Sequence, residues 1–233
     1  MTITTRTAKG SELTHAELDE NMTDFRDGVA LQVPKTQGTG LKVDSLGTPD
    51  FGWHDINGTP LFDSTDPSSA AMAVYSGTMR QIQVAETKQF TVNFHIPHDY
   101  AMGTDLFVHV HWSHTSATLT GGSTTWGFET CYAKGHDQGA FVGSKTVTIL
   151  QAANTTQYQH MIAEGALSIS GGSATQLDTA DLEVDGIIFC RVYLDSNDLT
   201  DSGVVPDPFI HFIDLHYQST GVPTKQRAPD FWT

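Results

Sequence analysis

The stretch "QFTVNFHI", residues 89–96, decides the fold class because apolar and polar side chains alternate along it. Neighbouring side chains of a β-strand point to opposite faces of a sheet, so alternate residues share a face. The apolar face of this stretch consists of Phe90, Val92, Phe94 and Ile96. We therefore expect a half-buried strand whose apolar row belongs to a hydrophobic core.

The next such stretch, "LFVHVHW" at 106–112, has the same period and places two histidines on one face. Val108 and Val110 alternate with His109 and His111. Valine is buried far more often than histidine. We therefore expect the valines to face the core and the two histidines to face solvent or a partner. The core face then consists of Leu106, Val108, Val110 and Trp112.

Five further runs have strand character, and glycine and proline residues separate them. They span residues 124–133, 144–150, 157–163, 185–194 and 207–218. No helical period lies between them, so about eight strands at this spacing predict a mainly β protein, an antiparallel sandwich or barrel. A jelly-roll-like β-sandwich is the preferred architecture.

One short helix is expected near the N-terminus, after an extended Thr-rich arm. Thr14 and Glu17 form a capping box, and Gly28 is suited to end the helix. The apolar positions of this segment are Leu13, Leu18, Met22 and Phe25. A stripe this narrow cannot form a core by itself, so it packs either on the β domain of its own chain or on another chain.

These patterns divide the chain into four segments. Residues 1–28 form the arm and the capped helix, which we expect to serve attachment. Residues 29–75 are rich in Gly, Pro, Asp and Ser and predict an extended irregular segment that lies along its own domain or a neighbour. The β-sandwich occupies 76–218, and 219–233 form a C-terminal tail with aromatic anchors near its end.

The composition argues against several classes of partner. With 12 Lys and Arg against 27 Asp and Glu, the chain has a net charge of -15. Phosphate backbones and anionic membrane surfaces attract clustered cations, so we expect neither nucleic acid nor a membrane as a partner. The sequence shows neither an apolar run of membrane-spanning length nor a signal-peptide pattern, and we expect the chain to stay where it is made. Cys131 and Cys190 are expected to be reduced, buried thiols.

The 11 histidines make a metal site the first chemical hypothesis to weigh. His109 and His111 share a strand face, and an H-x-H pair can ligate a metal. No carboxylate follows within a few residues, although Glu129 and His216 could converge in space. Structural histidines and no cofactor are the preferred expectation. Since nucleophile and phosphate-loop motifs are missing and 195–206 departs from the EF-hand template, we expect a protein without enzymatic activity.

Three stretches resemble proteins of tailed-bacteriophage particles. "SELTHAELDENMTDF" at 11–25 is similar to an "LT-x-x-ELD-x-N" segment near the N-termini of appendage and fibre proteins. "IPHDYAMGTDLFVHVHW" at 96–112 and "FIHFIDLHYQSTGVPTKQRAPDFW" at 209–232 are similar to phage virion proteins. The resemblance implies a virion structural protein, assembled in the host cytoplasm. Its N-terminal segment would bind other virion proteins of the capsid, neck or tail, and its β domain would face outward.

The chain has no coiled-coil or repetitive shaft, which favours a compact decoration, head-spike or adaptor protein over a long fibre. By analogy with jelly-roll virion modules, we expect a homotrimer. The alternative is a short tail-fibre or receptor-binding protein that recognises a host surface glycan. Its candidate contacts are the aromatic residues Trp53, Tyr100 and Trp126.

Overall fold

The computed structural model describes residues 51–231 except 64, 142, 222, 225 and 230, together with the backbone of 31–32 and 42–43. The chain divides into two compact units, Met1–Asp50 and Phe51–Thr233. In the first unit, the described residues form an antiparallel pair of β1 (Leu31–Gln32) and β2 (Lys42–Val43). The expected N-terminal helix, with Leu13, Leu18, Met22 and Phe25, lies outside the described residues.

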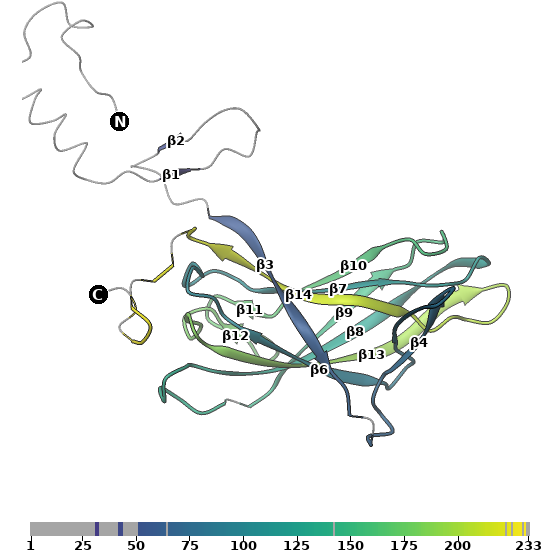
Figure 1. The fold of residues 1–233 in the computed structure, drawn as a ribbon, viewed down its shortest axis with the longest axis horizontal. Coiled ribbons are helices and arrows are strands. Elements are labelled where there is room, and N and C mark those ends of the chain that lie inside the picture. The colour runs from purple at the N-terminus through teal and green to yellow at the C-terminus, as the bar shows by residue number, and fades with distance from the viewer. Residues whose placement is uncertain are drawn as a thin grey trace, which may run out of the picture. The chain divides into compact units, whose positions relative to one another are not determined.

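The second unit is all β in its described part (Figure 1). Its strands are β3 (Gly52–Leu61), β4 (Ala71–Ser76), β5 (Met79–Gln83), β6 (Gln89–His95), β7 (Phe107–Ser113), β8 (Leu119–Ala133), β9 (Lys145–Ala152), β10 (Met161–Ala166), β11 (Ser168–Ile169), β12 (Leu177–Asp178), β13 (Ile187–Asp201) and β14 (Phe209–Ser219). The order along the main sheet is β10-β7-β14-β3-β6-β13-β8-β9, and all these neighbours are antiparallel. No helix in the described part could cross a membrane.

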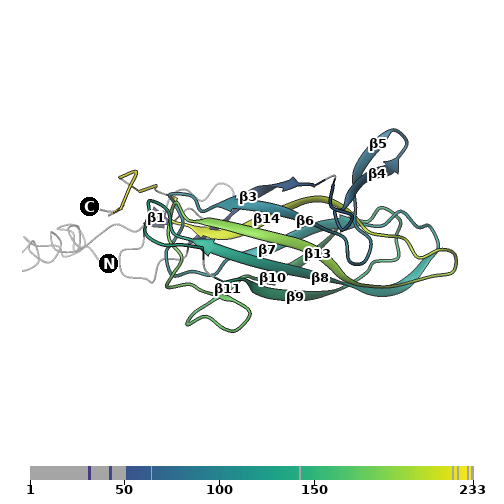
Figure 2. The ribbon, with the colours of Figure 1, turned by 90° about the horizontal axis from the view of Figure 1, so that it is seen from below.

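Strand β3 connects two layers of this sheet. Its residues 52–58 pair with β14, whereas 59–61 pair with β6. The first layer therefore contains β10, β7, β14 and most of β3, and the second contains β6, β13, β8 and β9. The β4–β5 hairpin joins the edge of β14 through β5 and projects from the sandwich (Figure 2).

The core lies between the two layers. Trp112 of β7 and Trp126 of β8 are both fully buried, and their ring centroids lie 6.0 Å apart. The two apolar rows expected from the sequence are buried as well, from Phe90 to Ile96 and from Leu106 to Trp112. The predicted fold class, an antiparallel β-sandwich of the jelly-roll type, is confirmed.

The expectation of an irregular segment up to residue 75 is wrong for β3 and β4. The β3 sequence "GWHDINGTPL" reads as a loop because Gly, Asp, Asn and Pro are rare in strands. Tertiary packing explains Gly58, since a Cβ atom there would lie 2.0 Å from Val92 Cγ1. Pro60 stands near the end of the strand, where a missing N–H is tolerated best.

Smaller corrections concern the strand ends. The run at 157–163 becomes strand only from Met161. The run expected at 185–194 is longer than predicted, since β13 continues to Asp201. In the C-terminal tail, Phe231 is buried in the core. Both cysteines are free thiols; Cys190 is buried as expected, whereas Cys131 is half-buried.

A histidine–carboxylate cluster as the candidate functional site

The outer face of the first layer carries a group of histidines and carboxylates from four adjacent strands. Asp214 of β14 stands directly opposite His109 of β7, and Glu164 of β10 stands opposite His109 on its other side. Asp55 of β3 stands opposite His216 of β14. Because side chains two residues apart share a face, one face collects all of them. The histidine–carboxylate cluster comprises Asp55, His109, His111, Glu164, Asp214 and His216.

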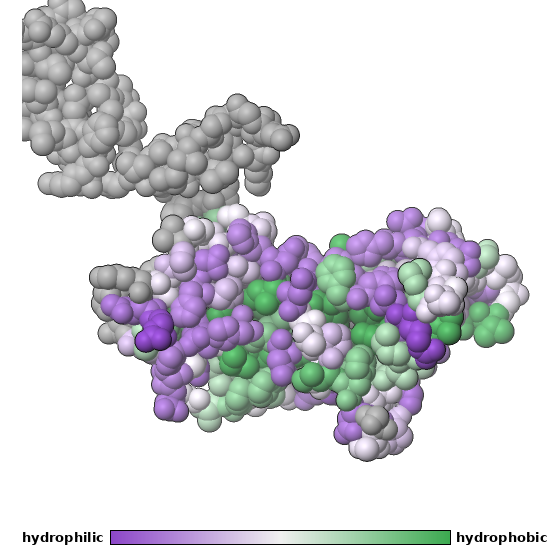
Figure 3. All heavy atoms as spheres, in the orientation of Figure 1, coloured by the Kyte–Doolittle hydropathy of each residue, from purple (hydrophilic) through white to green (hydrophobic). Residues whose placement is uncertain are grey.

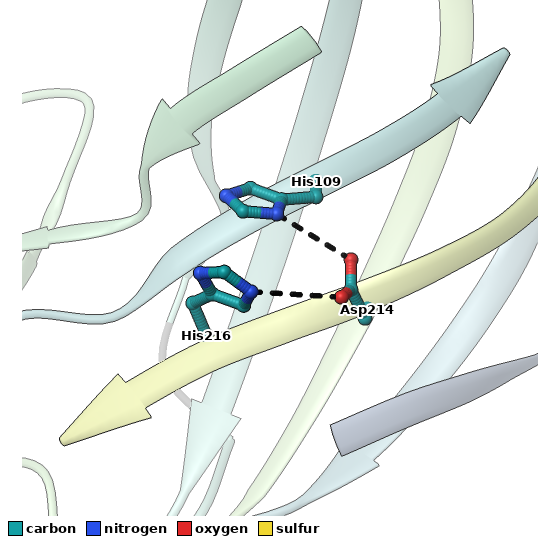
Figure 4. A group of neighbouring side chains, drawn as sticks. All are labelled: His109, Asp214 and His216. Carbon is teal, nitrogen blue, oxygen red and sulfur yellow. Dashed lines mark ion pairs between the residues drawn. The ribbon is translucent and has the colours of Figure 1, made fainter. Parts of the chain in front are cut away.

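Asp214 contacts three histidines of this cluster, and Figure 4 shows two of them, His109 and His216. Its Oδ1 atom is 3.7 Å from His109 Nδ1 and 3.2 Å from His111 Nε2, and its Oδ2 atom is 3.8 Å from His216 Nε2. The outer carboxylates contact the histidines from the sides. Glu164 Oε2 lies 2.6 Å from His109 Nε2, and Asp55 pairs with His216 Nε2.

The two strand histidines are buried, which corrects the expectation that they face solvent or a partner. They do point away from the core, since Val108 and Val110 occupy the inner face. His109 and His111 nevertheless are only 4% and 7% exposed. The His216 ring covers His109 at a centroid distance of 3.8 Å, and the Phe212 and His160 rings stack on His111 at 3.9 and 4.9 Å.

A second polar chain continues from the cluster along the same face. His111 Nδ1 lies 2.7 Å from His160 Nε2. Further along, Ser113 Oγ lies 2.9 Å from His211 Nε2 and 2.8 Å from the Tyr75 hydroxyl. Burial lowers the pKa of His111, against the opposing effect of the Asp214 carboxylate. Burial also lowers the pKa of His211, with a smaller contribution from the charges of His160 and His111.

The arrangement offers donor atoms of the kind that bind transition metals. His109, Asp214 and His216 each present one ligand atom, and the three atoms lie within 4.8 Å of one another. Imidazole nitrogens and carboxylate oxygens are common ligands of zinc and related ions. In the described part of the chain, this is the group of three such residues that could hold an ion.

Other candidate residues lie apart from this cluster or inside the core. Glu129 of β8 pairs with Arg191 at 2.6 Å in the second layer and does not join His216. Among the glycan candidates, Tyr100 and Trp126 are fully buried, whereas Trp53 is 49% exposed. Asp214 was missed. Asp214 and His216 stand two residues apart on one strand, as His109 and His111 do. This second pair was the pattern that could have indicated Asp214.

A separate cavity of about 530 Å³ lies near the ends of β8 and β12. Tyr132, Gln138, Lys145 and Asp178 are among its lining residues. The Lys145 ammonium donates a hydrogen bond to the Ser173 carbonyl oxygen at 2.7 Å. The Tyr132 hydroxyl accepts one from the Glu183 backbone N–H at 3.0 Å. Both polar groups therefore have partners within the protein.

Comparisons with known proteins give no family. No protein-family model and no curated protein matches the sequence. Among solved structures, the chain is similar to the CBM22-1–GH10 modules of endo-1,4-β-D-xylanase 10B from Clostridium thermocellum, complexed with xylohexaose. The identity is 10% and the TM-score 0.32, over 70% of this chain and 26% of that chain. It is also similar to TmCBM61 in complex with β-1,4-galactotriose, with 10% identity and a TM-score of 0.28 over 71% of this chain and 88% of that one. The chain thus spans about a quarter of the first of these structures. At these TM-scores, neither similarity assigns a function.

Proposed function

We propose that the protein is a non-enzymatic structural component of a tailed-bacteriophage particle. It attaches to the capsid or neck through its N-terminal unit and displays the β-sandwich outward, as a decoration, head-spike or adaptor protein. The observation that carries this proposal is the division of the chain at Asp50 and Phe51.

The proposal assigns attachment to the apolar side chains of the N-terminal segment, Leu13, Leu18, Met22 and Phe25. In a protein of net charge -15, copies repel one another unless specific contacts hold them. Apolar side chains provide such contacts, because burying them contributes about 25 cal/mol per Å² of apolar area. The sandwich also offers an apolar surface to neighbours.

Apolar patches interrupt the hydrophilic surface on the face that Figure 3 shows. The β4–β5 hairpin carries Met72, Val74 and Met79, which are all exposed. Patches of this kind commonly mark protein–protein contacts. We assign this hairpin to contacts between sandwiches in a homotrimer.

The test compares the full chain with a chain that starts at Phe51, each carrying a label at its C-terminus. Both are added to purified particles that lack the protein, and the particles are imaged. We expect label on the head or neck with the full chain and none with the shortened chain. A cooperative unfolding transition of the shortened chain serves as the control that its β-sandwich is folded. The full chain with Leu18→Asp and Met22→Asp should also fail to attach. Attachment of the shortened chain would overturn the proposal.

One exposed aromatic residue favours a second candidate, a module that binds a host surface glycan. Trp53 of β3 packs edge-on against Phe107 at a centroid distance of 5.5 Å and lies 6.3 Å from His216. An aromatic surface beside a few polar groups is typical of small-ligand sites. Binding to a glycan array that Trp53→Ala abolishes and Phe62→Ala retains would support this function. Phe62 is a suitable control because it is also exposed and follows the other end of β3.

A further inference from the structure

We propose that His109, Asp214 and His216 form a binding site for a divalent transition-metal ion, with Zn²⁺ as the ion that fits best. The inference is independent of the proposed function, since it concerns the outer face of the first layer and not the N-terminal unit. It rests on the placement of the three residues, their distances, the groups that orient them and the charge of the cluster.

The placement of the three residues is rigid. His109 and Asp214 are opposite partners on adjacent antiparallel strands, and His216 follows Asp214 by two residues on the same face. Opposite residues of such a pair have Cβ atoms about 4.5–5.5 Å apart. On their inner side, the two strands are anchored in the core by buried side chains such as Val110 and Ile213. Sites on such strands hold their geometry better than sites on loops.

Two distances in the cluster are close to those of a zinc site. Zinc binds nitrogen and oxygen ligands at about 2.0–2.2 Å, which places two ligands of a tetrahedral site roughly 3.4 Å apart. The structure has 3.7 Å between His109 Nδ1 and Asp214 Oδ1 and 3.8 Å between His216 Nε2 and Asp214 Oδ2. Each ring therefore has to approach the carboxylate by a few tenths of an ångström. The two contacts use different oxygens of Asp214, and the three ligand atoms lie within 4.8 Å of one another, so the rings also have to move toward each other.

Neighbouring groups orient the ligands as they do in known metal sites. Glu164 accepts a hydrogen bond from His109 Nε2–H at 2.6 Å, which leaves the lone pair of Nδ1 for the ion. His111 Nε2 lies 3.2 Å from Asp214 Oδ1 and holds the carboxylate in place. Asp55 pairs with His216 Nε2 and is 53% exposed at its side chain, so it can turn aside or join the ion as a further oxygen ligand.

The charge of the cluster favours a cation. Asp214 is 2% exposed, and its ion pairs among the described residues are with histidines. Glu164 and Asp55 add two further carboxylates at its edges. Three carboxylates therefore lie within or beside the proposed site: Asp214 as a ligand, and Glu164 and Asp55 next to the two histidine ligands. A buried carboxylate requires compensation, which a divalent ion supplies.

The experiment is titration of Zn²⁺ into the full-length chain after dialysis against a chelator, followed by calorimetry. We expect one Zn²⁺ per chain and a higher unfolding temperature with the ion. His216→Ala removes one ligand at a partly exposed position and should weaken binding at least about 100-fold. Glu164→Gln should weaken it by about 10- to 100-fold, because the group that orients His109 is lost. His54→Ala, on the neighbouring strand β3 but outside the cluster, should leave binding unchanged.

A second histidine group serves to locate the ion. His95 and His136 both pair with Asp185 elsewhere in the sandwich, and His95 lies 2.6 Å from it. His95→Ala should bind Zn²⁺ like the unmodified protein. Absence of stoichiometric binding, full binding by folded His216→Ala, or loss of binding in His95→Ala would each overturn the proposal. The cluster would then be a hydrogen-bonded network that needs no ion.

Discussion

Replacing Gly58 by alanine tests whether β3 runs from the first layer to the second and packs against β6 at Gly58. The added Cβ atom would lie 2.0 Å from Val92 Cγ1 and 2.8 Å from Phe94 Cε1. Carbon atoms in contact normally stand about 3.5–4.0 Å apart. Val92 and Phe94 are completely buried, at 0% and 1% exposure, so neither side chain has free space to move into. The substitution must therefore displace core side chains or the strand itself.

The expected loss of stability is about 2 kcal/mol. Overpacking a core costs roughly 1–3 kcal/mol, and an approach of 2.0 Å to a fully buried side chain belongs at the upper end of that range. Alanine also restricts the unfolded chain, which returns about 0.4–1 kcal/mol of stability. For a domain of this size, each kcal/mol changes Tm by about 2–4 °C. Gly58→Ala should therefore lower Tm by about 4–8 °C.

The assay is thermal and urea unfolding of the full chain, followed by circular dichroism. Gly52→Ala is the matched control, because it lies on the same strand and no atom stands within 4 Å of its added Cβ. Its stability should change by less than about 0.5 kcal/mol. Val92→Ala removes the nearest clashing atom. The double variant Gly58→Ala/Val92→Ala should therefore lose about 1 kcal/mol less free energy of unfolding than the two single variants lose in sum.

Equal stability of Gly58→Ala and Gly52→Ala would refute the reasoning. Gly58 would then have no packed neighbour, and 52–61 would belong to the extended segment that the sequence pattern alone predicted.

Two further predictions concern titration and thiol chemistry. Burial lowers the pKa of His211 from 6.5, so the unfolded chain binds more protons below that pH and the free energy of unfolding falls on acidification. The urea midpoint, measured with a chelator present, should be lower at pH 5.5 than at pH 7.5, two values on either side of the ordinary histidine pKa of about 6.5. His211→Gln should reduce this difference between the two midpoints. An unchanged difference would show that His211 is not its origin. Burial raises the pKa of Cys190 to about 12, so this thiol should not react with a disulfide reagent in the folded protein. At most Cys131 should react before unfolding and both thiols in guanidinium, whereas rapid reaction of both in the native state would contradict the buried position.

Local patterns in the sequence were sufficient for the strands of the core. The alternation in 89–96 and 106–112 predicts which residues face inward, and the structure buries those rows completely or nearly so. This works because the direction of a side chain on a strand depends only on its position along that strand. The mainly β fold class follows from several such runs without any knowledge of their partners.

Strand β3 shows why local patterns fail elsewhere. Gly58 and Pro60 look like loop residues, but the strand tolerates them because Val92 and Phe94 fill the space beside Gly58 and the ladder ends at Leu61. The requirement for glycine comes from residues more than thirty positions away in the chain, on β6. No local propensity contains that information.

The histidine–carboxylate cluster was decided by tertiary structure alone. The sequence identified His109 and His111 as a pair on one strand face, but it could not supply their partners. His111 and Asp214 are 103 residues apart, and only the register between β7 and β14 brings their side chains together. A shift of that register by one residue would turn Asp214 to the core face and dissolve the cluster. Sequence determined which residues could act as ligands, and strand pairing determined which of them meet.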